Sequence, residues 1–168
     1  MALTIINSPG LSTSNSYVSL ATANLYVSEN IHISATFASL STNDASACLI
    51  YATSLLDAQM DWIGTKGAST QALDFPRDNL VDKNGYDVTS TDIPIPIQRA
   101  TSYFGYFLSQ ENRISDPSNF GFKSLKAGSL EMVVDKYDRR PVMPNFIFDL
   151  LKPFGTKINS AIRTLVRK

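Results

Sequence analysis

The sequence is poor in the residues on which most catalytic and metal sites depend. Its 168 residues include one histidine, His32, and one cysteine, Cys48. A Ser-His-Asp or Cys-His set needs a histidine beside its nucleophile, and His32 stands in an expected loop, where a structural histidine is more common. Cys48 lies in an apolar run, which favours a small buried hydrophobe. Because GxGxxG, HExxH and P-loop motifs are also missing, we expect no catalytic residue, no cofactor, no metal and no enzymatic activity.

Long apolar runs are missing as well. No stretch approaches the roughly 18 apolar residues that span a bilayer, so no membrane partner is expected. The N-terminal stretch MALTIINSPGLSTSNS lacks the basic start and the long apolar core of a signal peptide. A single cysteine and 43% hydrophobic residues fit one folded domain in a reducing cytoplasm.

Charge is nearly absent from residues 1–43, which carry only Glu29. Residues 44–92 carry eight acids and three bases, whereas residues 93–168 carry twelve bases and six acids. Segments of unlike charge can attract copies of the same chain or a partner. The alternative is a solvated surface on which the charges happen to sort in this way.

Apolar residues at spacings of three and four predict four helices. Suitable capping residues stand where the first two should begin, at Ser19 and at Thr42 or Asn43. The predicted helices cover about 20–29, 42–62, 95–109 and the chain from 144 onward.

The C-terminal part adds two features to this pattern. Residues 120–137 change to alternation of apolar and polar side chains, which predicts a β-hairpin turning near 127–128. Pro144 can open the last helix, and Pro153 and Gly155 should kink or break it midway.

These elements predict a mainly α fold. It is a small helical bundle with a short β-hairpin element, an extended N-terminal arm and a kinked C-terminal helix. The corresponding divisions are an arm over residues 1–18, a helical domain over 19–152 and a basic C-terminal tail over 153–168.

The stretch QALDFPRDNLVDKNGYDV, residues 71–88, stands out in composition. Asn84 and Gly85 form a pair that accepts positive φ in a tight hairpin turn. Asp82, Asn84 and Asp87 bring oxygen ligands together, but a calcium loop of the EF-hand kind needs Gly at its sixth position and Glu at its twelfth. Here Gly85 is fourth from Asp82, so a solvated turn is favoured over a metal loop.

Asp57 and Asp61 form the one pair of acids at helical spacing in an apolar setting, beside Trp62. Two carboxylates at i and i+4 near the end of a helix are most often a solvated edge. We therefore expect both side chains to face water.

Single-stranded nucleic acid is a candidate ligand, because the tail is basic and aromatic residues are plentiful. Tyr103, Phe104 and Phe107 fall at helical spacing, which favours a core or interface role over base stacking. The basic tail could still touch phosphates without reading sequence.

The order of features resembles a family of small tailed-phage proteins, the head-to-tail connectors, adaptors or head completion proteins. Members of this group are sometimes labelled as resembling the single-stranded-DNA-binding domain of a bacterial primosomal protein. The resemblance runs from Ser16 to Phe154, with Phe75 where Trp is more usual. Its most specific block comprises Trp62, Gly64, Gln71, Leu73, Phe75, Pro76, Arg77, Asp82, Gly85, Ile93 and Pro94.

The resemblance implies a structural virion protein at the neck, assembled in the host cytoplasm. It implies a ring of this chain, commonly of twelve copies, under the portal protein. The ring extends the DNA channel, in which DNA passes without sequence reading, and offers a platform to a tail or stopper protein. The alternative, from another functional class, is a single-stranded-DNA-binding or replication-associated protein.

Two groups of residues follow as candidate sites. The motif block would serve the fold of the loop or a subunit contact. The tail would contact the portal or another partner through Phe154, Lys157, Ile158, Ile162, Arg163, Leu165, Arg167 and Lys168.

Overall fold

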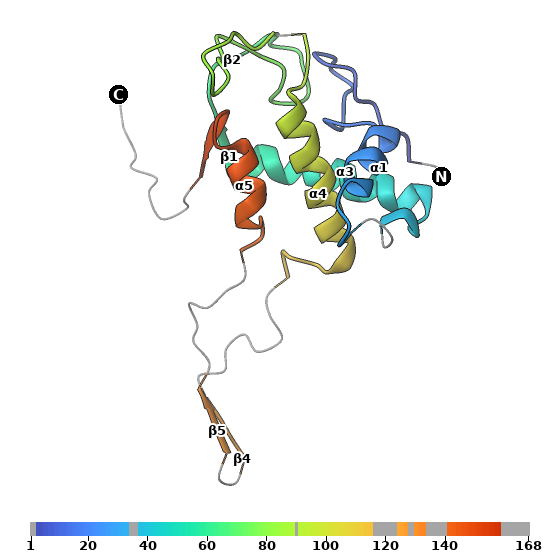
Figure 1. The fold of residues 1–168 in the computed structure, drawn as a ribbon, viewed down its shortest axis with the longest axis vertical. Coiled ribbons are helices and arrows are strands. Elements are labelled where there is room, and N and C mark those ends of the chain that lie inside the picture. Colours follow the sequence, from blue (N-terminus) through green and yellow to red (C-terminus); the bar gives the residue numbers. More distant parts are fainter. Residues whose placement is uncertain are drawn as a thin grey trace.

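The protein is described by a computed structural model covering residues 3–33, 37–89, 91–115, 124–127, 130–133 and 141–158. Helices predominate, as the apolar spacing predicted, and they are accompanied by short antiparallel strands (Figure 1). No helix in this part of the chain is long and apolar enough to cross a membrane. The helices are α1 (Leu20–Ser28), α3 (Thr42–Gln59), α4 (Ile95–Gln110) and α5 (Asn145–Leu151). The strands are β1 (Met60–Trp62), β2 (Thr65–Lys66), β3 (Arg77–Asp78), β4 (Ser124–Ala127), β5 (Leu130–Val133) and β6 (Gly155–Lys157).

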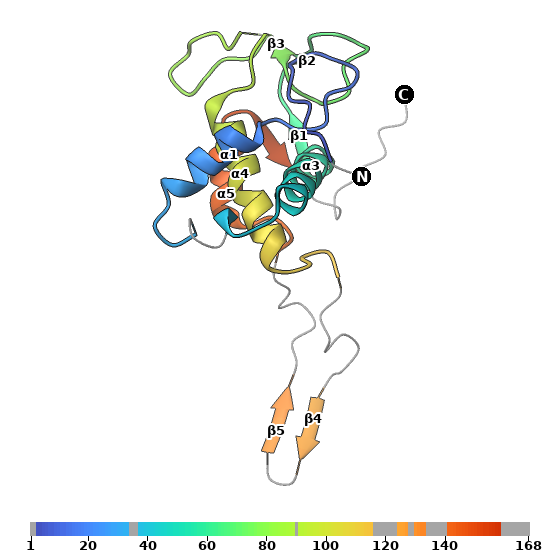
Figure 2. The same cartoon turned by 90° about the vertical axis from the view of Figure 1, so that its right-hand side faces the viewer.

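Helix α4 is the centre of the fold. Figures 1 and 2 show α1, α4 and α5 forming one layer, with α3 behind it. One side of α4 is fully buried, through Ile97, Ala100 and Phe104, against Leu56 of α3 and Leu151 of α5. A second apolar cluster lies between α1 and the start of α3. Helices α1, α3 and α5 all pack against α4. The side of α4 that they do not cover lies toward the surface.

The helices begin close to the predicted caps. The Ser19 hydroxyl accepts a hydrogen bond from the Thr22 amide, which confirms the start of α1. Helix α3 is capped one residue earlier than predicted, by Ser41, whose hydroxyl accepts from the Asp44 amide at 3.1 Å. Pro144 precedes α5 as its N-cap residue. Local capping chemistry therefore sets these boundaries.

The predicted end of α3 is wrong, whereas the last helix is broken rather than kinked. Helix α3 stops at Gln59 rather than at residue 62, and α5 ends at Leu151, just before Pro153, as the break alternative predicted. The chain beyond each helix becomes a strand, and β1 pairs with β6 in antiparallel register. A Cβ at Gly155 would lie 2.8 Å from the Asp61 carbonyl oxygen, so glycine is required for this close pairing.

The N-terminal segment, residues 3–18, has no helix or strand but is fixed by hydrogen bonds. The Ile6 amide donates to the Asn15 side chain at 2.8 Å, and the Asn15 amide donates to the Ile6 carbonyl at 2.8 Å. The Ala72 amide donates to the Leu11 carbonyl at 3.2 Å. Tyr17 is fully buried at the end of the segment. The segment thus folds onto its own chain.

The β-hairpin predicted from alternation is confirmed. Strands β4 and β5 pair antiparallel, with Ala127 opposite Leu130. Figures 1 and 2 show this hairpin standing apart from the helices.

Candidate nucleic-acid interface

The aromatic members of the sequence motif are core residues. Trp62 and Phe75 meet edge to face, with ring centroids 5.0 Å apart. Phe75 also meets Tyr17 at 6.2 Å and Phe154 at 6.4 Å in the same geometry. Phe154, predicted as a tail contact for a partner, is 4% exposed and instead completes this cluster.

Gln71 fixes the path of the loop from inside. Its buried side-chain oxygen accepts from the Ala68 amide at 3.1 Å. Its side-chain nitrogen donates to the Leu73 carbonyl at 2.9 Å and to the Pro76 carbonyl at 3.0 Å. Pro76 is buried and follows a cis peptide bond after Phe75. A buried side-chain amide without hydrogen-bond partners would lower the stability of the fold, so these three hydrogen bonds fix the loop around Gln71.

Arg77 closes the base of the loop. Its Nε donates to the Ile63 carbonyl at 2.8 Å and its Nη2 to the Gly64 carbonyl at 2.7 Å. Gly64 has φ +81°, and a Cβ there would lie 2.4 Å from the Asp78 carbonyl oxygen. Strand pairing between β2 and β3 leaves no room for any other residue at position 64.

The predicted turn at Asp82–Gly85 is present, with one difference. Gly85 has φ +85°, whereas Asn84 does not have positive φ. The Gly85 amide donates to the Asp82 carbonyl at 3.0 Å. The Asp82 carboxylate accepts from the Asn84 amide at 2.8 Å and from the Tyr86 amide at 2.9 Å. These donors lower the pKa of Asp82.

The prediction that both Asp57 and Asp61 face water is wrong for Asp57, which accepts several hydrogen bonds. Only Asp61 of the pair is exposed. The Asp57 carboxylate accepts from the Tyr17 hydroxyl and from Trp62 Nε1 at 3.2 Å. It also accepts from the Asp74 amide at 3.3 Å. Burial raises the pKa of Asp57 to about 6. Burial, and then the neighbouring Asp57, raise the pKa of Tyr17.

The described residues of the C-terminal site lie beside this motif region. Lys157 is opposite Met60 in the β1–β6 pair, and the Ile158 amide donates to the Gln59 carbonyl at 2.8 Å. The remaining predicted tail residues lie outside the described part of the chain, namely Ile162, Arg163, Leu165, Arg167 and Lys168.

A different surface presents aromatic rings to solvent. Phe146 of α5 is 42% exposed and contacts Tyr103 of α4 at 6.1 Å and Phe107 of α4 at 5.6 Å between ring centroids. Tyr106 meets Phe107 at 5.2 Å. The three α4 residues are half-buried, whereas Phe104, between them in sequence, is fully buried. The predicted core role therefore holds for Phe104 and only in part for its neighbours.

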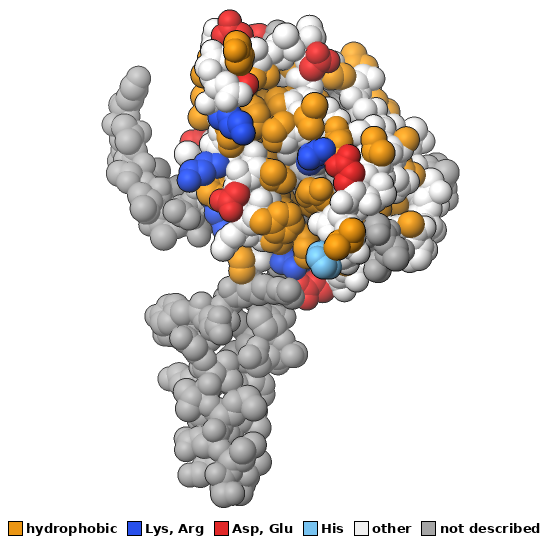
Figure 3. Space-filling view, viewed as in Figure 1, with side chains coloured by type: hydrophobic (Ala, Val, Ile, Leu, Met, Phe, Trp, Pro, Cys, Tyr) orange, Lys and Arg blue, Asp and Glu red, His pale blue; other side chains and the backbone are white. Residues whose placement is uncertain are grey.

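Arg99 and Arg113 each lie over a ring at this surface, but the Arg113 side chain is only 5% exposed and pairs with Glu111 at 3.2 Å. The Arg113 guanidinium is 5.0 Å from the Phe107 centroid, and the Arg99 guanidinium is 5.1 Å from the Tyr26 centroid. Arg99 also pairs with Glu29 at 2.9 Å, and both side chains are more than a third exposed. Figure 3 shows hydrophobic side chains gathered over α4 and α5, with Lys and Arg side chains at intervals around them.

We call this surface the aromatic face, made of Tyr26, Arg99, Tyr103, Tyr106, Phe107, Arg113 and Phe146. Positions 99, 103 and 106 recur at spacings of four and three, so they form one stripe along α4. The spacing was visible in the sequence. The sequence did not show which side of α4 other helices cover, and this packing decides which rings reach water.

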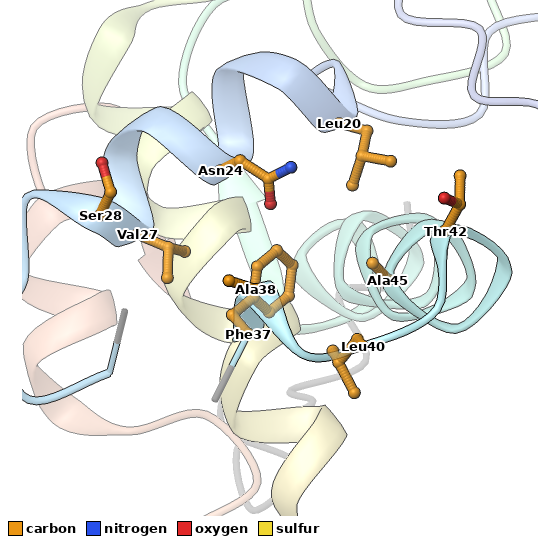
Figure 4. A pocket seen from close by; sticks show the side chains of 9 residues that line it. All are labelled: Leu20, Asn24, Val27, Ser28, Phe37, Ala38, Leu40, Thr42 and Ala45. Carbon is orange, nitrogen blue, oxygen red and sulfur yellow. The ribbon is translucent and has the colours of Figure 1, made fainter. Parts of the chain in front are cut away.

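A cavity of about 400 Å³ between α1 and the start of α3 is less suited to a charged ligand (Figure 4). Its polar lining consists of Asn24, Ser28 and Thr42, and no charged side chain of the described residues lines it. The described residues also contain no cluster of three or more His, Cys, Asp or Glu that could hold a metal ion.

Net charge is divided between two parts of the sequence. Residues 3–115 and 141–158, which include all four helices, carry eleven acids and seven bases. Residues 116–140 and 159–168 carry eight bases and four acids. We call residues 3–115 and 141–158 the helical body, and the basic excess lies in the other two segments of the sequence.

Comparison with known proteins gives one match. No curated protein and no solved structure matches the chain. A family model described as "Putative DnaT-like ssDNA binding protein" matches residues 1–168. The prediction of a head-to-tail connector of the virion is wrong, because this match names a single-stranded-DNA-binding family and nothing supports a connector, a ring, a portal or a tail partner. Over its whole length, the chain belongs to the family of DnaT-like single-stranded-DNA-binding proteins.

Proposed function

We propose that the protein binds single-stranded DNA and that the aromatic face is where the bases stack. The single observation that carries this is the exposed ring of Phe146 in contact with Tyr103 and Phe107, beside Arg113. Proteins that bind single strands combine aromatic platforms with cationic groups along the strand. The family description supports the same ligand.

Arginine suits this surface better than lysine would. A planar guanidinium can lie on a ring or a base and still pair with phosphate. The Arg99 guanidinium lies on the Tyr26 ring. Its side chain is exposed enough to exchange the Glu29 carboxylate for a phosphate. An exposed pair of this kind is worth little in water, so the exchange costs little.

The stripe on α4 gives the interface a length. Arg99 and Phe107 are eight residues apart, which corresponds to about 12 Å along a helix. This length is enough for two or three stacked nucleotides. A contact of this size reads base faces rather than sequence.

Electrostatic attraction comes from other parts of the chain. The helical body is acidic, whereas residues 159–168 contain three bases and no acid. We therefore assign part of the phosphate attraction to this segment and the stacking to the aromatic face. Deleting the segment removes up to three phosphate contacts and is expected to reduce the salt dependence of binding by about 2 in log-log slope.

The test is titration of a fluorescent oligothymidine of about 20 nucleotides, a length that covers the usual site sizes. Phe146→Ala should weaken binding at least fivefold, since stacking on one ring contributes about 1–3 kcal/mol. Its salt slope should match that of the unmodified protein, because no charge is lost.

Tyr51→Ala is the matched control. Tyr51 is 47% exposed, close to Phe146, but lies on α3 rather than on the α4–α5 surface. It should leave binding unchanged. No binding by the unmodified protein, or equal losses in both variants, would overturn the proposal.

A further inference from the structure

The segment between β3 and α4 carries the most exposed aromatic side chain of the described residues. Tyr86 is 73% exposed, and no ring in the part of the chain that the structure describes stacks on it. It belongs neither to the core nor to the aromatic face. A single exposed ring is by itself ordinary on a protein surface. The backbone of Tyr86 is held in place.

Two hydrogen bonds hold Tyr86 to Asp82 across the turn. The Asp82 amide donates to the Tyr86 carbonyl at 2.8 Å, and the Tyr86 amide donates to the Asp82 carboxylate at 2.9 Å. Val81 pairs with Asp87 in an antiparallel bridge. At the base, the Val88 amide donates to the carbonyl of Leu80, which is buried. A ring on such a support loses little backbone freedom when it binds.

The segment projects on the same side of the molecule as the aromatic face. Figure 2 shows the chain between β3 and α4 on the side where α1, α4 and α5 lie, away from α3. It leads directly into α4, whose outward stripe begins with the exposed Ile95 and continues to Arg99. We call residues 81–87 the Tyr86 hairpin. A DNA strand that lies along α4 would therefore meet the Tyr86 hairpin at one end.

We propose that Tyr86 is a separate stacking contact, taking one unpaired base of the DNA strand that occupies the aromatic face. This rests on the proposed function. The charges around the ring favour a base over a phosphate, because Asp82 and Asp87 flank it against Lys83 alone. A base in a duplex has both faces covered by its neighbours, so this contact selects single strands.

The experiment compares Tyr86→Ala and Tyr86→Trp on the oligothymidine and on a duplex of the same length. Tyr86→Ala should bind the single strand at least about fivefold more weakly, whereas Tyr86→Trp should stay within about twofold. Duplex affinity and the salt slope should not change in either variant. Val81→Ala, a 53% exposed position on the same hairpin, is the matched control and should bind normally.

The outcomes separate this proposal from the one on which it depends. Unchanged binding by Tyr86→Ala, with a loss in Phe146→Ala, overturns the hairpin contact and leaves the aromatic face. Equal losses on single strand and duplex also overturn it. Failure of the unmodified protein to bind the oligothymidine overturns both.

Discussion

The motif loop, residues 62–85, and the aromatic face use aromatic and arginine side chains in opposite ways. In the loop, Trp62 and Phe75 are buried, and Arg77 donates to backbone carbonyls of the same chain. In the aromatic face, Phe146 is exposed, and Arg99 lies over a ring at the surface. The same residue types stabilise the fold in the motif loop, whereas in the aromatic face they remain accessible to a ligand.

This difference explains why the most specific sequence block gave the wrong function. Its residues satisfy one another: Gln71 holds the Pro76 carbonyl, and Arg77 holds that of Gly64. Such a block marks an architecture, and architecture alone does not determine a function. The surface proposed to bind has no motif of its own.

The largest expected effect is on stability in the loop. Phe75→Ala should lower the free energy of unfolding by about 3–5 kcal/mol, because the ring is fully buried among three others. Phe146→Ala should cost about 1 kcal/mol or less, since its ring is partly in water. Urea unfolding measures both. Similar losses of unfolding free energy in the two variants would contradict the difference between a buried motif loop and an exposed aromatic face.

Two glycines with positive φ sharpen the same comparison. Gly64→Ala meets both backbone strain and the Asp78 carbonyl 2.4 Å away, and should cost well over 2 kcal/mol. Gly85→Ala meets strain alone, with nothing within 4 Å, and should cost about 1 kcal/mol. Thermal unfolding of the pair tests this. If Gly85→Ala is the more harmful, the loop base is less tightly closed than described.

The two arginines should differ in their tolerance of lysine. Arg77→Lys loses the fork that reaches the Ile63 and Gly64 carbonyls and should cost about 1–3 kcal/mol of stability. Arg99→Lys loses an exposed pair and should leave stability within about 0.5 kcal/mol. Chemical denaturation curves give both values. The account predicts that Arg99→Lys instead weakens DNA binding.

A further contrast concerns pH. Burial raises the pKa of Asp57 from 3.8 to about 6, so between these values the folded protein keeps a proton that the unfolded chain has released. The contribution of Asp57 to stability is therefore full below about pH 4 and is lost as pH rises through about 6, by at most about 1.4 kcal/mol per pH unit.

Asp57→Asn should remove this loss. The difference in unfolding free energy between Asp57→Asn and the unmodified protein should shift in favour of the variant from pH 4 to pH 7. Asp61→Asn, at an exposed position on β1, is the control for the loss of one carboxylate. A flat difference for Asp57→Asn would show that the carboxyl titrates normally.

Much of the fold could be predicted from local patterns. Ser19 and Pro144 mark helix starts, and the spacing of Ile97, Ala100 and Phe104 gives the buried side of α4. The β1–β6 pair could not be predicted. Its strands are three residues long and more than ninety residues apart, so neither carries a period of its own.

The candidate site was harder to predict for a related reason. Helical spacing placed Tyr103 and Phe107 with Phe104, but only tertiary packing separates the buried ring from its half-exposed neighbours. Asp57 shows the reverse case. A carboxylate beside Asp61 suggested water, yet three donors converge on Asp57, two of them from residues 17 and 40 positions away in the sequence.

The central claim is that the aromatic face, and not the motif loop, meets DNA. Ultraviolet crosslinking of the protein to oligothymidine, followed by identification of the crosslinked peptides, tests this most directly. The account predicts crosslinks at Tyr103, Tyr106, Phe107 and Phe146. Crosslinks concentrated between Trp62 and Asp78, with none on α4 or α5, would contradict it.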